Sequence, residues 1–108
     1  MTALVWCPFP DQGAAQSVAN TLLEEELVAC ANIVPGMHSL FVWKGERGES
    51  QEVGVLFKTN SSLLESVVSR IESLHPYDAP AIFGWHCEAA GTSTRAWLGE
   101  LSEHNESD

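Results

Sequence analysis

The sequence predicts one α+β domain, residues 1–108, of the ferredoxin-like type with an extra helix near its C-terminal end. Three observations lead to this fold. A length of 108 residues suits a single domain, and a hydrophobic fraction of 44% is enough for a core. Four β-prone segments and two segments of helical periodicity follow one another in the order β-α-β-β-α-β, which is the split βαβ arrangement.

The first strand and helix are predicted in the N-terminal quarter. Residues 2–9 form an apolar, β-prone run that stops at Pro10-Asp11, as a buried strand does. Asp11 is a good N-cap for the helix that follows. The helix has apolar residues at three- and four-residue steps, which are Ala15, Val18, Ala19, Leu22, Leu23 and Leu27. The acidic run at 24–26 is assigned to its solvated face.

A long strand pair is predicted next. Residues 31–43 form one strand with a kink at Pro35-Gly36, where a backbone donor is missing and φ is unrestricted. Residues 44–49 form the turn, and residues 52–59 the return strand. The return strand alternates, so one of its faces is predicted to be buried, and that face carries Val53, Val55 and Phe57.

The second helix is predicted to start after Asn60-Ser61-Ser62, and Ser62 with Glu65 matches a capping box. Its apolar side is Leu64, Val67, Val68, Ile71 and Leu74. It ends at His75-Pro76, because proline disfavours the helical conformation in the residue before it. A fourth strand at 81–87 and a short last helix with Ala96, Trp97, Leu98 and Leu101 follow. Residues 102–108 are polar and are predicted to form a flexible tail.

The predicted topology leaves apolar surface without cover. If both crossovers are right-handed, both helices lie on the same face of the sheet. The other face is then bare, although apolar side chains point to it. The strand pair 37–59 is also longer than a four-stranded sheet of this size can pair along its whole length. Both features predict self-association through strand edges and the bare face.

Charge and composition exclude several classes of partner. The chain has 15 acidic and 5 basic residues, a formal net charge of −10. Nucleic acid and anionic membrane surfaces need clustered Lys and Arg, and here the basic residues are scattered. No apolar run reaches the ~18 residues of a membrane helix, and the first residues carry no basic segment typical of a signal peptide. Three widely spaced cysteines are not a disulfide framework, so we expect a cytosolic protein.

The motifs of enzymes are missing, and a soft metal is the better candidate ligand. The sequence has no nucleophile elbow, zinc-protease motif or phosphate-binding loop, so we do not expect an enzyme. Cys7, near the end of the first strand, and an imidazole would suit copper. His75 is the best placed imidazole because the rigid Pro76 follows it. The alternative is structural: Cys7 as a small buried hydrophobe, and His75 as a partner of its helix's last carbonyls.

An ordered set of short motifs then resembles one family. The set consists of Cys7 with Pro10-Asp11, Cys30-Ala31-Asn32-Ile33-x-Pro35-Gly36, Ser39-x-x-x-Trp43-x-Gly45, Glu52, Lys58-Thr59 and His75-Pro76-Tyr77-Asp78-x-Pro80. In this order and spacing the sequence resembles the CutA1 family of divalent-cation tolerance proteins over about residues 3–101.

The resemblance implies a homotrimer, similar in architecture to the PII signalling proteins. It further implies a cytoplasmic protein of copper tolerance that binds copper weakly or transiently and has no established enzymatic activity. Cys7 and His75 match two proposed copper ligands of the family, whereas Leu74 stands where a further His is expected. Phe41 and Thr94 replace usual tyrosines, and Ala81 replaces a frequent Glu.

Two functions are therefore expected, and a third remains open. The first is a trimer that binds copper or another divalent cation through Cys7 and His75. The alternative is a PII-like regulatory trimer that binds a small metabolite or a protein at its subunit clefts. Trp43, Glu52, Lys58 and Tyr77 are the candidates to line such a cleft. The third is an assembly module without a small ligand.

Overall fold

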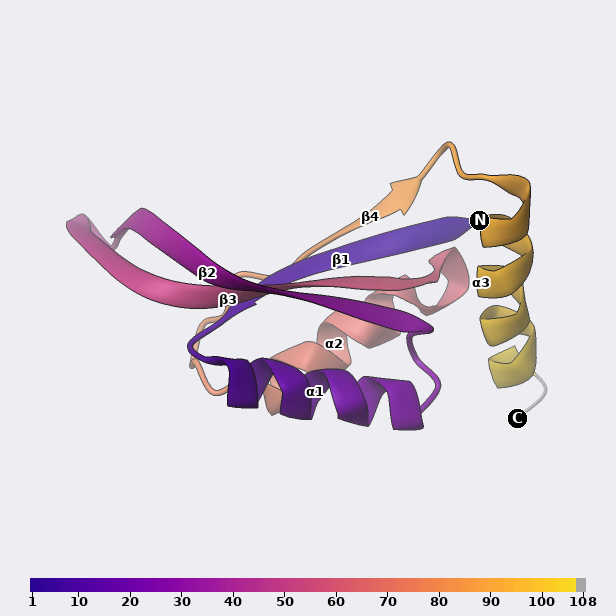
Figure 1. Cartoon of the computed structure of the whole chain (residues 1–108), viewed down its shortest axis with the longest axis horizontal. Helices are drawn as coiled ribbons and strands as arrows, with labels where there is room; N and C mark the ends of the chain where they lie inside the picture. Colours follow the sequence, from indigo (N-terminus) through magenta and orange to yellow (C-terminus); the bar gives the residue numbers. More distant parts are fainter. Residues whose placement is uncertain (107–108) are drawn as a thin grey trace.

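A four-stranded antiparallel sheet, with two helices on one face and a third helix across one end, forms the molecule (Figure 1). The computed structural model describes residues 1–106, with side chains up to residue 101. The elements are β1 (Thr2–Phe9), α1 (Gln12–Glu24), β2 (Cys30–Trp43), β3 (Glu46–Asn60), a 3-10 turn (Ser61–Leu63), α2 (Leu64–Leu74), β4 (Phe83–Cys87) and α3 (Thr92–Glu106). The predicted order β-α-β-β-α-β with an extra helix is confirmed.

Strand β1 is central in the sheet, whose order is β2-β3-β1-β4. It pairs with β3 on one side and β4 on the other, so that Val5 lies between Phe57 and Gly84. Its odd-numbered residues are fully buried towards the helices, and they are Ala3, Val5, Cys7 and Phe9. The even-numbered residues, such as Leu4 and Trp6, lie on the opposite face.

Helix α1 begins as predicted and ends earlier. Asp11 is extended (φ −156°), and its carboxylate accepts the backbone N–H of Ala14 at 2.8 Å. The predicted helix up to Leu27 is wrong, because α1 ends at Glu24 and Glu26 adopts a left-handed conformation with φ 59°. Leu27 still packs against the core from the following loop.

Strands β2 and β3 form a hairpin that extends well beyond the rest of the sheet (Figure 1). The predicted kink is confirmed: the register shifts between Val34 and Met37, and Gly36 has φ 76°. The predicted turn at 44–49 is wrong. Trp43 already pairs with Glu46, and the turn consists of Lys44 (φ 51°) and Gly45 (φ 82°). Two positive φ angles match the twist of the flanking strands, as in a type I′ turn.

Helix α2 starts one residue later than predicted. Asn60 caps a 3-10 turn, since its side-chain oxygen accepts the N–H of Ser62 at 3.2 Å. The helix itself begins at Leu64, so the prediction of Ser62 as its N-cap is wrong. Its end is as predicted: His75 is extended (φ −69°, ψ 139°), as a residue before proline prefers.

The C-terminal elements differ in length from the prediction. Strand β4 starts at Phe83 rather than at residue 81. Helix α3 is longer than the short helix predicted and runs from Thr92 to Glu106 across the end of the sheet (Figure 1). Leu98 anchors it, because that side chain is buried and its carbonyl accepts from Asn60 Nδ2 at 3.3 Å. Residues 102–106 of the predicted flexible tail belong to α3, and residues 107–108 lie outside the described residues, so the flexibility of the tail stays a prediction.

Both crossover helices cover the same face, as the handedness rule predicts (Figure 1). The core lies between them and β1 and β3. On the opposite face, Phe83 and Trp85 are 61% and 43% exposed, beside Trp6 and Leu4 of β1. The hairpin adds an exposed apolar run, residues 40–43. The predicted bare apolar face is therefore confirmed.

Candidate functional site

The candidate site lies where β1 ends beside the C-terminal end of α2. Strand β1 supplies Cys7 and the carbonyl of Pro8, and the residues after α2 supply His75 and Tyr77. Strand β3 supplies Glu52, next to Val53, the partner of Phe9 in the sheet. The fold therefore brings together, at one end of the core, residues from three separate parts of the sequence.

Cys7 is fully buried and protonated. Its side chain points to the helix-covered face, and its thiol donates to the carbonyl oxygen of Pro8, with Sγ 3.5 Å from that oxygen. Burial raises the pKa of Cys7 to about 12, and the negative charge of Glu52 acts in the same direction. At neutral pH the group is a thiol and not the thiolate that binds metals.

His75 is held by both ring nitrogens and by one ring face. The side chain is largely buried, with 8% of its surface exposed. Its Nδ1 lies 3.1 Å from the backbone nitrogen of Tyr77, which can only donate, so Nδ1 accepts. Nε2 therefore carries the hydrogen and donates to the carbonyl oxygen of Pro8 at 2.8 Å. The ring also stacks on Phe9 with centroids 4.5 Å apart, so one neutral tautomer is fixed.

The two predicted metal ligands thus converge on one backbone atom. Both Cys7 Sγ and His75 Nε2 donate to the oxygen of Pro8. They are neighbours, but each directs a hydrogen, not a lone pair, towards the space between them. Among the residues that the structure describes, no three His, Cys, Asp or Glu side chains are grouped so that they could hold a metal ion. The described part of the chain therefore offers a pair of potential ligands at this place and no complete set.

The other cysteines and imidazoles lie elsewhere. Cys30 and Cys87 are free and partly exposed, at opposite edges of the sheet. His38 lies on the hairpin with its Nδ1 3.1 Å from Gln51 and its Nε2 3.3 Å from Glu49. His86 lies on β4, while the side chain of His104 is outside the described part of the chain.

Tyr77 links His75 to a second candidate site. Its hydroxyl donates to Glu52 Oε2 at 2.8 Å, and its ring centroid lies 4.9 Å from that of His75. Burial raises the pKa of Tyr77 to about 12, and the bond to Glu52 and its charge contribute in the same direction. The phenol therefore remains a donor at any physiological pH. Tyr77 thus connects the two sites: its backbone N–H bonds to His75, which bonds to Pro8, and its hydroxyl bonds to Glu52.

A cleft of about 650 Å³ lies between the hairpin and the loop at 77–81. Three of the four predicted cleft residues, Trp43, Glu52 and Tyr77, line it together. Lys58 does not, since it is six residues from Glu52 along β3, a separation of about 20 Å in an extended strand. The sequence reasoning missed Lys44 as part of this cleft, because the residue was assigned to a longer turn.

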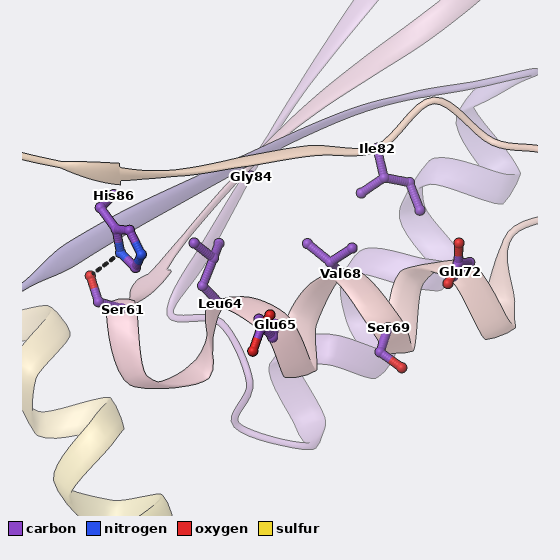
Figure 2. Close-up of a pocket in the computed structure, with 9 residues that line it drawn as sticks. All are labelled: Ser61, Leu64, Glu65, Val68, Ser69, Glu72, Ile82, Gly84 and His86. Atoms are coloured by element: carbon purple, nitrogen blue, oxygen red, sulfur yellow. Dashed lines mark hydrogen bonds between the residues drawn. The ribbon is translucent and has the colours of Figure 1, made fainter.

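A separate groove of about 560 Å³ runs between α2 and β4 (Figure 2). Leu64, Val68 and Ile82 form its apolar floor, and His86 closes one end with its Nδ1 2.8 Å from Ser61 Oγ (Figure 2). Gly84 allows β4 to approach the helix, because a Cβ there would lie 2.9 Å from Leu64 Cδ1. None of the residues predicted for a site lies in this groove.

No helix among the described residues is both long enough and apolar enough to cross a bilayer.

Comparison with known proteins gives a consistent result across nearly the whole chain. Residues 3–101 match the family model described as CutA1 divalent ion tolerance protein. The divalent-cation tolerance protein CutA of Pyrococcus horikoshii is 39% identical over 97 residues, which cover 90% of this chain and 94% of that protein.

Two solved structures show the same fold. The divalent ion tolerance protein CutA1 of Ehrlichia chaffeensis superposes with a TM-score of 0.87 at 31% identity, covering 94% of each chain. The periplasmic divalent cation tolerance protein CutA of Archaeoglobus fulgidus also has a TM-score of 0.87, at 29% identity, covering 94% of this chain and 98% of that one.

Proposed function

Because the chain belongs to the CutA1 family of divalent ion tolerance proteins, we propose that it binds a divalent cation, copper first among them, and contributes to tolerance of that metal. Its role is binding rather than catalysis. Cys7 and His75 both direct their hydrogens at a backbone carbonyl, whereas a nucleophile and its base would be bonded to each other.

The convergence of Cys7 and His75 on the carbonyl of Pro8 carries this proposal. A thiolate and an imidazole form a pair that suits copper. To bind it, Cys7 loses its proton and His75 gives up its bond to Pro8. Because Leu74 replaces the further His expected from the family, water or a neighbouring subunit supplies the remaining ligands. Proton release on binding means that affinity falls as the pH falls.

Titration of the reduced protein with copper, measured by isothermal calorimetry in the absence of oxygen, tests the site. The wild type is expected to take up about one copper per chain, as one site per subunit requires. Cys7→Ser and His75→Ala are each expected to weaken binding at least about tenfold, the loss typical of a removed interaction at a metal site. Cys30→Ser is the matched control, because that thiol is distant from His75. Unchanged stoichiometry and affinity in both site variants would refute the assignment.

We further propose that the subunits form a homotrimer. The bare face with Phe83 and Trp85 supports it, as do the exposed hairpin residues Leu40 and Val42, whose side chains alternate with those of Phe41 and Trp43. Water contact with so much apolar surface is unfavourable. Native mass spectrometry should then give a particle of about 35 kDa, three chains of 11.8 kDa each. A particle with the mass of one chain would contradict the proposal.

A second function, that of a PII-like regulatory trimer, is favoured by the cleft itself. Trp43, Glu52 and Tyr77 line its wall together, and Tyr77 also contacts His75. A thermal-shift screen of nucleotides, carboxylates and amines tests it, since a ligand that binds only the folded state raises the Tm. A screen without any shift would remove this function and would leave the cation-binding function in place.

We place the protein in the cytosol. The three free cysteines support this, since oxidising compartments favour disulfides. The relative from Archaeoglobus fulgidus is named periplasmic, so the location needs its own test. The test is cell fractionation with one cytosolic and one periplasmic marker enzyme. Recovery of the protein with the periplasmic marker would overturn the assignment.

A further inference from the structure

We propose that the cleft between the β2–β3 hairpin and the loop at 77–81 binds a small organic cation, a quaternary ammonium or amine with an apolar body. This inference rests on the second proposed function, that of a ligand-binding cleft, and names the chemical class of its ligand. Three features of the cleft carry it: its aromatic wall, a cation already placed against that wall, and its carboxylates.

The wall of the cleft is aromatic and accessible. Trp43 is 56% exposed, and Tyr77 and Phe41 contribute further ring surface to the same cleft. Each of these rings carries a negative electrostatic potential on its face, which attracts a cation. The ring surface is also apolar, so that contact with an apolar body removes that surface from water. Pro80 adds apolar surface opposite the hairpin.

The protein's own Lys44 shows that this wall accepts a cation. Its ammonium nitrogen lies 5.8 Å from the centroid of the Trp43 ring, within the range of a cation–π contact. Lys44 is in the two-residue turn with φ 51° and directly follows Trp43 in the sequence. The lysine acts as an internal stand-in for the ligand and competes with it.

Two carboxylates give the cleft a negative charge, which favours a cationic ligand. Glu52 and Asp78 both line it, and Lys44 is the one basic residue among its lining residues. The Tyr77 hydroxyl donates to Glu52 Oε2 and so holds this carboxylate at the wall. A carboxylate has further lone pairs that can accept from a ligand. An anion would meet these carboxylates, and the chain's net charge of −10 opposes it as well.

A matched set of probes tests the charge requirement. We expect choline to bind to the intact assembly more tightly than its uncharged isostere, in which carbon replaces the nitrogen, and dimethylbutyrate not to bind. The measurement is a nuclear magnetic resonance titration at physiological salt, followed at the Trp43 indole N–H, whose signal is assigned from its loss in Trp43→Leu. Equal binding of choline and the uncharged isostere would overturn the inference.

Four variants separate the cleft from the general negative charge of the protein. Trp43→Leu is expected to weaken choline binding about fivefold, and Glu52→Gln about threefold. Lys44→Asn is expected to tighten it about twofold to threefold, because asparagine tolerates the left-handed turn and the competing ammonium is gone. Arg95→Gln on α3 changes the net charge equally and is expected to have no effect. If Arg95→Gln tightens binding as much as Lys44→Asn does, the site is not the cleft.

The result also distinguishes this inference from the function on which it rests. If the thermal-shift screen finds a nucleotide or carboxylate and choline does not bind, the regulatory cleft stands and the organic cation is refuted. If neither the screen nor choline gives a response, both are refuted. A shift of the Trp43 signal by choline, together with a raised Tm from an amine in the screen, supports both.

Discussion

Both ring nitrogens and one ring face of His75 make contacts that stabilise the fold. One nitrogen donates to Pro8, the other accepts from Tyr77, and the ring stacks on Phe9. The residue therefore ties the end of α2 to the end of β1. Any ligand that takes a ring nitrogen must break one of these bonds, each of which contributes about 1 kcal/mol to stability. That cost is consistent with weak rather than tight binding of a metal.

Because the thiol of Cys7 is buried, we expect the stability of the fold to fall as the pH rises above 9. Its pKa is raised from 9.0 to about 12, so between these values the unfolded chain loses the proton and the folded chain keeps it. The free energy of unfolding should then fall by about 1.4 kcal/mol per pH unit above pH 9. We expect urea titrations at pH 8 and pH 10 to show this loss in the wild type and a smaller one in Cys7→Ala. An equal loss in both proteins would show that Cys7 is not its source.

At this scale the sequence indicated which side chains lie close together but not their protonation or hydrogen bonding. Cys7 and His75 were predicted as neighbours from a family motif, and the structure places them together. Their common partner is a backbone oxygen, that of Pro8, which no side-chain pattern reveals. Burial, which keeps the thiol protonated, is likewise a property of the packed core and not of the local sequence.

At the scale of elements, two glycines in regular structure have opposite roles. A Cβ at Gly54 in β3 would lie 2.3 Å from the end of the Trp6 ring, whereas a Cβ at Gly99 in α3 would meet nothing within 4 Å. Gly54 lets the indole lie flat on the sheet. Gly99 only adds flexibility to a helix.

The two glycines should therefore respond oppositely to alanine. We expect Gly54→Ala to destabilise the protein by about 1–3 kcal/mol, because the Trp6 ring must move. Gly99→Ala should stabilise it by about 0.5–1 kcal/mol, because alanine restricts the unfolded chain and favours the helix. Thermal unfolding of both variants beside the wild type gives the comparison. A stabilised Gly54→Ala protein would show that Trp6 is not confined by its neighbours.

Element types were predictable from the sequence, and several boundaries were not. Periodicity sufficed for α1 and α2, since each buries one apolar side. The hairpin turn was predicted too long because Lys44 is an unusual residue for a left-handed position, and its conformation is imposed by the pairing of Trp43 with Glu46. Leu27 continued the helical spacing but reaches the core from a loop, an outcome that only tertiary packing decides.

At the scale of the whole molecule, the bare face of the sheet is the surface through which we propose that copies associate. Trp85 is 43% exposed there, and Leu23, on the outer side of α1, is similarly exposed at 39%. We expect Trp85→Glu to dissociate the assembly in native mass spectrometry and in sedimentation. Leu23→Glu is the matched control and should leave it intact, because the helices lie on the other face. Dissociation by both variants alike would argue for general destabilisation instead of a specific interface.

The central place of β1 also has a consequence for how the chain reaches its fold during synthesis. Strand β1 is made first, yet both its neighbours in the sheet come later, and Thr2 bonds to Cys87 across 85 residues of sequence. The hairpin of β2 and β3 is local and can form early, whereas the pairing of β1 with β4 must wait until β4 leaves the ribosome. Contacts so distant in sequence slow folding. The apolar strand β1 thus has no partner in the sheet until β3 has left the ribosome, and its second edge stays open until β4 follows.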